Sequence, residues 1–373
     1  MNAFAMDAPE IHDLAFARGR VALFALLKAL GVGRGDHILT QAFTCVAVPE
    51  AILAVGARPV YVDLAPASVT MSADDLTRKI SPQTRAVIVQ HTFGIPAEMA
   101  PILSVAERWG IPVIEDCCHT FLSRYQNRYV GTFGVGAFYS FEWGKPVTLG
   151  LGGAIRLNGH DDLEASLREV HGTLRRPTLS RTIKLELQYR VFRIAYQPAV
   201  YWPMKRLYRV LASAGVAVTN YHGEAAIDAN AAEFGQIMTK PCELRLRRWE
   251  QLATLHRDHS VAVARTLRDQ ITVATHVEIP CGSAPVYARY PLFVDDRQRL
   301  LGEAERCGIE LAGWYESAVH PLRGENLQKA GYELGSCPNA ELAARRVVSL
   351  PTHRKTSFRY ADKAAAFINA NCR

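Results

Sequence analysis

Residues 86–116 read AVIVQHTFGIPAEMAPILSVAERWGIPVIED, and this stretch decides the fold class. It contains an apolar run at 86–89, a helical apolar pattern at 100–109 and a second apolar run at 111–114. Short continuous apolar runs are typical of buried strands, and the longer pattern between them is typical of a helix. The order strand, helix, strand predicts two parallel strands joined by a crossover helix.

The same alternation of helical and strand patterns runs from about residue 20 to residue 157. Further strands are expected at 37–40, 59–63, 135–141 and 153–157, and further helices at 21–30, 49–55, 73–80 and 160–172. This repetition predicts an α/β fold with a mainly parallel sheet between layers of helices.

The later part of the chain predicts a smaller α+β domain. A long helix is expected from Glu243 to Leu267. It is followed by expected strands near 271–279 and 286–294 and by expected helices near 297–307, 339–347 and 358–370. We therefore expect a large domain over residues 1–245 and a small C-terminal domain over residues 246–373.

The positive charge of the chain is concentrated in one segment. The formal net charge is +7, and residues 175–210 alone carry +8, because nine basic residues there accompany a single acid, Glu186. The rest of the chain therefore sums to −1. A local excess of this kind argues against general nucleic-acid binding.

The charged segment belongs to a basic, aromatic insertion at 175–230, for which two interpretations stay open. Its apolar helical stripe consists of Ile183, Leu187, Val191 and Ile194, and Pro198 and Pro203 are expected to interrupt the helix. Cations interleaved with aromatic rings suit an anionic surface, such as a membrane, a lipid-linked substrate or the diphosphate of a nucleotide sugar. The alternative is an arm that packs on a partner subunit.

The N-terminal twenty residues contain acids and no continuous apolar run, so we expect no secretory signal and a cytoplasmic protein. The basic segment adds the option of peripheral contact with the inner membrane surface. Eight cysteines form no CxxC pair and no zinc-like spacing with histidine. We expect reduced thiols and no metal site.

Two charged residues follow predicted strands of the sheet. Asp116 closes the run that begins at Ile111, and Lys145 follows the strand that ends at Phe141. Both are therefore expected at the carboxyl edge of the sheet, where ligands bind. Pyridoxal phosphate requires a lysine for its aldehyde, a carboxylate for its ring nitrogen and donors for its phosphate, and Ser140 offers such a donor. These residues alone leave open a helix-capping aspartate and a solvated surface lysine.

A series of motifs in fixed order narrows this choice. They are GD at 35–36, FTCVA at 43–47, GARPVYVD at 56–63, HTFGIPA at 91–97, IEDCCH at 114–119, SFEWGK at 140–145 and GGA at 152–154. Together they resemble the DegT/DnrJ/EryC1/StrS aminotransferases, densely over residues 15–172 and sparsely afterwards. The resemblance implies a fold-type-I pyridoxal-phosphate transferase, with a sheet of the seven-stranded type and a smaller C-terminal α+β domain.

The resemblance also implies individual roles. Lys145 matches the lysine that forms the Schiff base with the cofactor, and Asp116 matches the partner of the pyridine nitrogen. His119 matches a residue that contacts the cofactor ring or its 3′-oxygen, and Ser140 matches a phosphate ligand. The substrate contacts that we expect are His91, Trp314, Tyr315 and His320.

The phosphate and ring positions depart from the family pattern. Arg18-Gly19-Arg20 stands where the family has a Gly-Thr or Gly-Ser loop. The helix start at Gly19 still supplies backbone N–H groups, and Arg20 can replace the hydroxyl by a charge-assisted bond. The alternative for Arg20 is a solvated helix-start residue. Cys45, beside the expected cofactor residue Thr44, stands where the family often stacks an aromatic ring.

The implied function is transfer of an amino group from an amino acid, glutamate or glutamine, to a keto sugar, usually nucleotide-linked, or to a keto cyclitol. The implied assembly is a homodimer with its active site at the interface, although the family's cross-subunit segment has no clear match near Asn230 to Met238. Two alternatives remain at this stage. One is a non-catalytic regulator that kept the fold, and the other is a pyridoxal-phosphate dehydratase or lyase.

Overall fold

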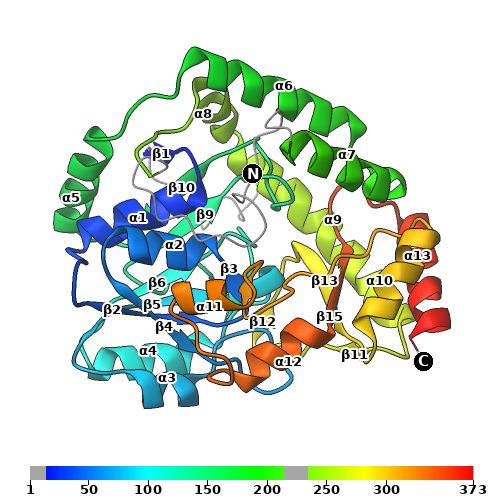
Figure 1. Ribbon diagram of the computed structural model, residues 1–373, viewed down its shortest axis with the longest axis horizontal. Coiled ribbons are helices and arrows are strands. Elements are labelled where there is room, and N and C mark those ends of the chain that lie inside the picture. Colours follow the sequence, from blue (N-terminus) through cyan, green and yellow to red (C-terminus); the bar gives the residue numbers. More distant parts are fainter. Residues whose placement is uncertain (1–13, 214–233, 373) are drawn as a thin grey trace.

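The computed structural model describes residues 14–213 and 234–372, and a seven-stranded sheet between helices forms its larger part (Figure 1). The strand order is β1 (Ala15–Phe16), β10 (Gly153–Leu157), β9 (Gly136–Ser140), β6 (Val113–Asp116), β5 (Thr84–Gln90), β2 (His37–Gln41) and β4 (Arg58–Val62). Five neighbouring strands, β9, β6, β5, β2 and β4, are parallel to one another. β10 and β1 run antiparallel to their neighbours. The predicted α/β fold with a mainly parallel sheet is confirmed.

Alternate residues of the central strands face two separate cores. Ile38 and Ile114 contribute to a core with α1, α2 and α5, and Leu39 and Val113 contribute to a second core with α3 and α4. These helices are α1 (Gly19–Ala29), α2 (Ala47–Ala54), α3 (Ala73–Lys79), α4 (Met99–Arg108) and α5 (Asp161–Gly172). Because side chains alternate along a strand, a strand covered on both faces must be apolar throughout, which explains the continuous runs in the sequence.

The β5–α4–β6 unit contains the stretch 86–116. Gly110 follows α4 with a φ of 62°, a conformation that glycine adopts without steric cost and that ends the helix. β6 begins and ends two residues later than predicted, so Asp116 is its last residue. The shift brings the Asp116 side chain to the edge of the sheet itself.

A second sheet forms the later part of the chain. Its order is β11 (Thr275–His276), β13 (Arg289–Phe293) and β15 (Val347–Pro351), with antiparallel pairing throughout. The accompanying helices are α9 (Trp249–Gln270), α10 (Arg297–Arg306), α11 (Glu325–Lys329), α12 (Pro338–Arg346) and α13 (Phe358–Asn371). The strand expected at 271–279 is therefore reduced to two residues.

The single helix expected from Glu243 to Leu267 is two helices, which corrects that prediction. α8 (Lys240–Leu246) ends before Arg248, whose backbone is non-helical at φ −109° and ψ 16°. Leu246 and Trp249 are buried in the same core on either side of this break. Tertiary packing of both side chains thus overrides the continuous helical pattern.

The described part of the insertion forms α6 (Leu179–Ala195), a 3-10 turn at Pro198–Val200 and α7 (Tyr201–Ser213). The two helices run along one edge of the molecule (Figure 1). Pro198 interrupts the helix as expected. Pro203 does not, because it lies in the first turn of α7, where no backbone N–H donor is needed. Residues 214–230 lie outside the described part.

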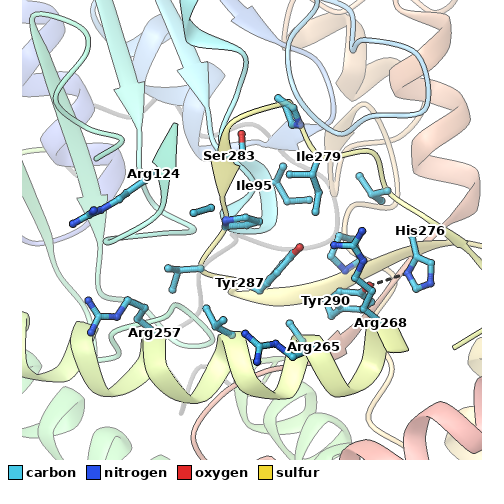
Figure 2. A pocket seen from close by; sticks show the side chains of 18 of the residues that line it. Ile95, Arg124, Arg257, Arg265, Arg268, His276, Ile279, Ser283, Tyr287 and Tyr290 are labelled. Carbon is cyan, nitrogen blue, oxygen red and sulfur yellow. Dashed lines mark hydrogen bonds between the residues drawn. The ribbon is translucent and has the colours of Figure 1, made fainter. Parts of the chain in front are cut away.

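A cavity of about 760 Å³ opens beside α9 (Figure 2). Arginines 257, 265 and 268 come from α9, and Arg124 comes from a small sheet. That sheet is formed by β7 (Arg124–Tyr125), β8 (Arg128–Tyr129) and β12 (Ser283–Ala284). Tyr290 also lines the cavity, and its hydroxyl lies 2.8 Å from Nδ1 of His276.

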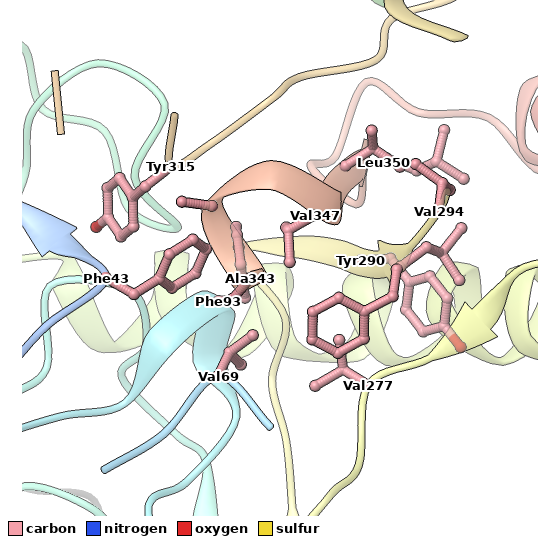
Figure 3. Close-up of a cluster of buried hydrophobic side chains, with 14 of the residues drawn as sticks. Phe43, Val69, Phe93, Val277, Tyr290, Val294, Tyr315, Ala343, Val347 and Leu350 are labelled. Carbon is pink, nitrogen blue, oxygen red and sulfur yellow. The ribbon is translucent and has the colours of Figure 1, made fainter. Parts of the chain in front are cut away.

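The early and late parts of the chain share one hydrophobic core (Figure 3). Phe43 and Phe93 from the early part belong to the same buried cluster as Tyr290, Tyr315 and Val347 from the late part. The core contains residues from both sides of the predicted domain boundary at 245/246. The division into two domains stays a prediction.

One testable consequence concerns His256 on α9, which is buried with Nε2 2.9 Å from the carbonyl oxygen of Tyr287. Burial lowers the pKa of His256 to about 4. The unfolded chain, with a histidine pKa near 6.5, therefore binds more protons than the folded chain as pH falls below about 6.5. We expect this residue to reduce the free energy of unfolding by about 1–2 kcal/mol between about pH 7 and pH 5.

Urea denaturation at both pH values measures this loss. His256→Gln should reduce the pH dependence by that amount, whereas His160→Gln, at an exposed position, should leave it unchanged. An identical pH dependence in His256→Gln and the wild type would contradict the prediction.

Candidate active site

The carboxyl ends of β6 and β9 lie side by side. Asp116 is the last residue of β6, Ser140 is the last residue of β9, and the two strands pair in parallel. Lys145 lies in the loop that connects β9 to β10. The structure therefore brings these predicted residues to one edge of the sheet.

The Asp116 carboxylate is buried at this edge. It accepts a hydrogen bond from the backbone N–H of Cys118 at 2.9 Å. Burial raises the pKa of Asp116 above its usual value, while Cys118 and the charge of Lys145 act against this rise. A buried carboxylate of this kind gains most from a cationic N–H partner that replaces the lost water.

The imidazole of His119 is held in one orientation. Its Nδ1 accepts a hydrogen bond from the Phe93 backbone N–H at 3.1 Å, so the proton of the neutral ring is assigned to Nε2. Nε2 lies 3.3 Å from the hydroxyl of Tyr315. Burial, and then the charge of Lys145, lower the pKa of His119 well below its usual value, so the ring is neutral near pH 7.

The rings of His119, Phe93 and Tyr315 form one cluster, in which the Phe93 and Tyr315 centroids are 6.5 Å apart. The His119 ring stacks with Phe93 at a centroid distance of 6.1 Å and with Tyr315 at 6.0 Å. Phe43 meets the edge of Tyr315 at 5.2 Å, and these three aromatic side chains lie together in Figure 3. The predicted residue Tyr315 thus contacts His119 directly, whereas Phe93 was not predicted as part of the site.

Lys145 lies in a tight loop and is half-buried. Its N–H donates to the Glu142 carbonyl at 3.2 Å, and its own carbonyl accepts from the Thr148 hydroxyl at 3.0 Å. The preceding Gly144 has a φ of 77°, and a Cβ there would lie 3.3 Å from the Trp314 ring. The loop therefore approaches Trp314 at Gly144, and the charge of Lys145 acts on the pKa values of Asp116 and His119.

The start of α1 approaches Ser140 so closely that only glycine fits. A Cβ on Gly19 would lie 2.9 Å from Cβ of Ser140 and 3.4 Å from Sγ of Cys118. Arg18 precedes the helix and provides no side-chain cap. The first-turn N–H groups and the Ser140 hydroxyl thus converge, as the site for an anion at a helix N-terminus requires.

Arg20, expected to bind phosphate, is buried in an ion pair with Glu50 of α2. A nearby ion pair joins Arg18 to Glu142 at 3.7 Å, also with both partners buried. The Arg20 charge is therefore balanced within the fold, and its contact with a phosphate stays a prediction.

Thr44 and Cys45 form the two-residue strand β3 (Thr44–Cys45), which pairs in parallel with β14 (Val319–His320). The Thr44 hydroxyl donates to Gln90 Oε1 at 2.6 Å. Half-buried Cys45 is in register with His320, whose pKa burial lowers to about 4. The pairing brings the predicted cofactor residue Cys45 and the predicted substrate residue His320 together.

His91 is fully buried, and both of its ring nitrogens are bonded within the protein. Nδ1 accepts from the N–H of Ala97 at 3.0 Å, and Nε2 lies 3.1 Å from the Glu115 carboxylate. These bonds give His91 a structural role at the sheet edge, and its contact with a substrate stays a prediction. Glu115 was not predicted as part of the site, and its carboxylate holds the His91 ring.

None of the residues predicted for the site lines the cavity beside α9, and that lining contains no lysine. The reacting groups are found at the strand ends instead. A buried carboxylate, a lysine, a neutral histidine and a helix-start anion site are the set that pyridoxal phosphate requires, so the residues present fit this cofactor. Fold and site define a pyridoxal-phosphate enzyme of fold type I.

The sequence signature of the DegT/DnrJ/EryC1/StrS aminotransferase family matches residues 2–190, and the chain belongs to this family. The predicted family, fold class and pyridoxal-phosphate cofactor are thereby confirmed.

Three similar proteins illustrate the relationship. GDP-perosamine synthase of Escherichia coli O157:H7 is 36% identical over 157 residues, which is 42% of this chain and 43% of that protein, so the match spans less than half of the relative. UDP-2-acetamido-2-deoxy-3-oxo-D-glucuronate aminotransferase of Pseudomonas aeruginosa is 28% identical over 92% of this chain and 81% of that protein. The structure of S. venezuelae DesV in complex with ketimine intermediate covers 96% of this chain and 84% of that one, with a TM-score of 0.71 at 22% identity, and supports the fold.

The contact between Gly19 and Ser140 generates a prediction for cofactor binding. Gly19→Ala forces Ser140 or the helix start to move, and overpacking of this kind costs about 1–3 kcal/mol. If the strain falls on the anion site, the affinity for pyridoxal phosphate should fall roughly tenfold. Titration of the apoprotein with the cofactor, followed by absorbance, measures the change.

Gly302→Ala is the matched control, because Gly302 lies in α10 and a Cβ there has open space around it. It should bind the cofactor as the wild type does. Equal affinities for Gly19→Ala and Gly302→Ala would show that the close approach does not form the phosphate site.

Proposed function

We propose that this protein is a pyridoxal-phosphate-dependent aminotransferase that moves an amino group from glutamate or glutamine to a nucleotide-linked keto sugar. The observation that carries the proposal is the convergence of Asp116, His119 and Lys145 at the carboxyl edge of the sheet. Bound pyridoxal phosphate supplies a ring that withdraws electrons from a reacting carbon.

Lys145 has two roles in this proposal. Its Nζ would hold the cofactor, and its amine would move a proton at the α-carbon of the amino donor. The backbone of Lys145 bonds to the Glu142 carbonyl and to the Thr148 hydroxyl, and these bonds hold the loop that carries Nζ.

Asp116 and His119 orient the cofactor. The buried Asp116 carboxylate would hold the ring nitrogen in its protonated form, and that pairing would offset the cost of burying the carboxylate. Neutral His119 has its N–H on Nε2, and the Phe93 backbone sets the direction of the ring. The Gly19 helix start and Ser140 would receive the phosphate.

The aromatic residues limit the access of water. Tyr315 and Phe93 cover His119, and Trp314 lies against the Lys145 loop. A site enclosed in this way strengthens every charge interaction within it. We assign Trp314, Tyr315 and His320 to the substrate side of the site.

The relatives support the class of the acceptor, and both the acceptor and the assembly belong to the proposal. The Pseudomonas aeruginosa relative is named for a nucleotide-linked 3-oxo sugar, which supports an acceptor of that class. We also propose a homodimer with the site at its interface. The retained pair Asp116 and Lys145 favours an enzyme over a non-catalytic regulator, and a lysine that returns protons favours transamination over dehydration.

Replacement of Lys145 tests the proposal. Lys145→Ala should lose the visible absorbance of covalently bound cofactor and at least about a thousandfold in turnover, since covalent and proton-transfer catalysis both depend on the amine. The measurement is a half-reaction in which holoenzyme is mixed with glutamate or glutamine and the cofactor spectrum is followed.

Lys329→Ala is the control, because Lys329 is exposed at the end of α11. It should retain both the absorbance and the turnover. Full turnover in Lys145→Ala would remove the catalytic assignment, and a dehydrated sugar as the product would establish the dehydratase alternative.

A further inference from the structure

The outer side of α6 exposes a continuous apolar stripe. Its members are Leu179, Ile183, Leu187, Val191 and Ile194, which are 76%, 60%, 63%, 52% and 79% exposed. They recur at every third or fourth position and therefore lie on one side of the helix. Isolated exposed apolar side chains are ordinary, but an aligned row of this length marks an interaction surface.

Exposed apolar residues also follow α6 in the chain. Val200, Leu207 and Val210 are 39%, 52% and 64% exposed along the 3-10 turn and α7. We call the five stripe residues of α6 and these three residues the α6–α7 face. Exposed cations accompany it, namely Lys184, Arg190, Arg193 and Arg206, of which Arg190 pairs with Glu186 and Arg206 with Glu305.

The inner side of α6 is the side that holds the helix to the protein. Leu185 and Tyr189 are buried, and Phe192 packs on Trp143 at a centroid distance of 5.0 Å. The Tyr196 hydroxyl donates to Glu310 at 2.7 Å. These contacts fasten α6 to the protein through its inner side, and the five stripe residues of α6 lie on the outer side.

We propose that the α6–α7 face docks on an anionic membrane surface. The argument is charge complementarity. Residues 175–210 carry a net charge of +8. In a symmetric contact between two copies, the cations of one copy would lie against the same cations of the other and repel them. The rest of the chain has a net charge of −1 and therefore no large excess of acid that could balance this segment.

An anionic lipid surface complements both features of the face. Apolar residues of an interfacial helix enter the boundary between headgroups and acyl chains, while flanking cations meet the lipid phosphates. No helix of the described ranges is long and apolar enough to cross a membrane. The proposed contact is with the membrane surface. No residue of this face belongs to the proposed active site, so the inference stands independently of the proposed function.

Vesicle flotation with the full-length holoenzyme tests the inference. Wild-type protein should float with vesicles containing roughly one third phosphatidylglycerol and stay behind with pure phosphatidylcholine. Raising the salt from about 0.1 M to about 1 M, which shortens the Debye length from roughly 10 to 3 Å, should release much of it.

A double variant separates the apolar stripe from general charge. Leu187→Gln with Ile194→Gln should lower the vesicle partition coefficient at least about tenfold, because two apolar side chains no longer enter the lipid. Leu334→Gln is the matched control, since Leu334 is 71% exposed on a different part of the surface, and it should bind as the wild type does. Circular dichroism of each variant should match the wild type, because the replaced side chains are exposed.

Three outcomes would overturn the inference. The first is wild-type protein that does not bind anionic vesicles. The second is binding that the double variant leaves unchanged. The third is a double variant that dissociates into smaller species in analytical ultracentrifugation without vesicles, which would assign the face to a second copy of the chain.

Discussion

The buried carboxylate of Glu115 fixes the edge of the sheet on which the site depends. It accepts hydrogen bonds from the N–H groups of Gly131, Phe133 and Gly134 at 2.7, 2.6 and 3.0 Å, and His91 Nε2 lies 3.1 Å away. Four donors keep the charge satisfied without water. Because neighbouring residues of a strand point to opposite faces, the anchor at Glu115 leaves the adjacent Asp116 directed to the other face.

The site also depends on a core that distant parts of the chain share. The Phe93 backbone orients His119, and Tyr315 covers it from a segment almost two hundred residues later. Phe43, the residue directly before β3, packs on the rings of both Phe93 and Tyr315. Side chains of this size transmit small displacements through close packing, so the orientation of His119 reflects the fit between the two parts of the protein.

The position of the site at the strand ends could be predicted from the sequence. The buried ion pairs near the site could not. Apolar runs mark the strands, and parallel strands bring Asp116, Ser140 and the Lys145 loop to one edge. Arg20 pairs with Glu50, which lies thirty residues away in the sequence, and no periodic pattern predicts such a partner. The break between α8 and α9 contains neither proline nor glycine, and the strands β3 and β14 are only two residues long. Such features arise from tertiary contacts that local propensity does not contain.

Trp143, two residues before Lys145, packs on Tyr189 and Phe192 of α6, so that α6 touches the loop there. One side of α6 packs against the loop that contains Lys145, and its other side is exposed to solvent. Any molecule that shifts α6 when it binds changes the free energy of the loop. By thermodynamic reciprocity, ligands that reorder the loop must then alter the affinity of the outer side by the same factor.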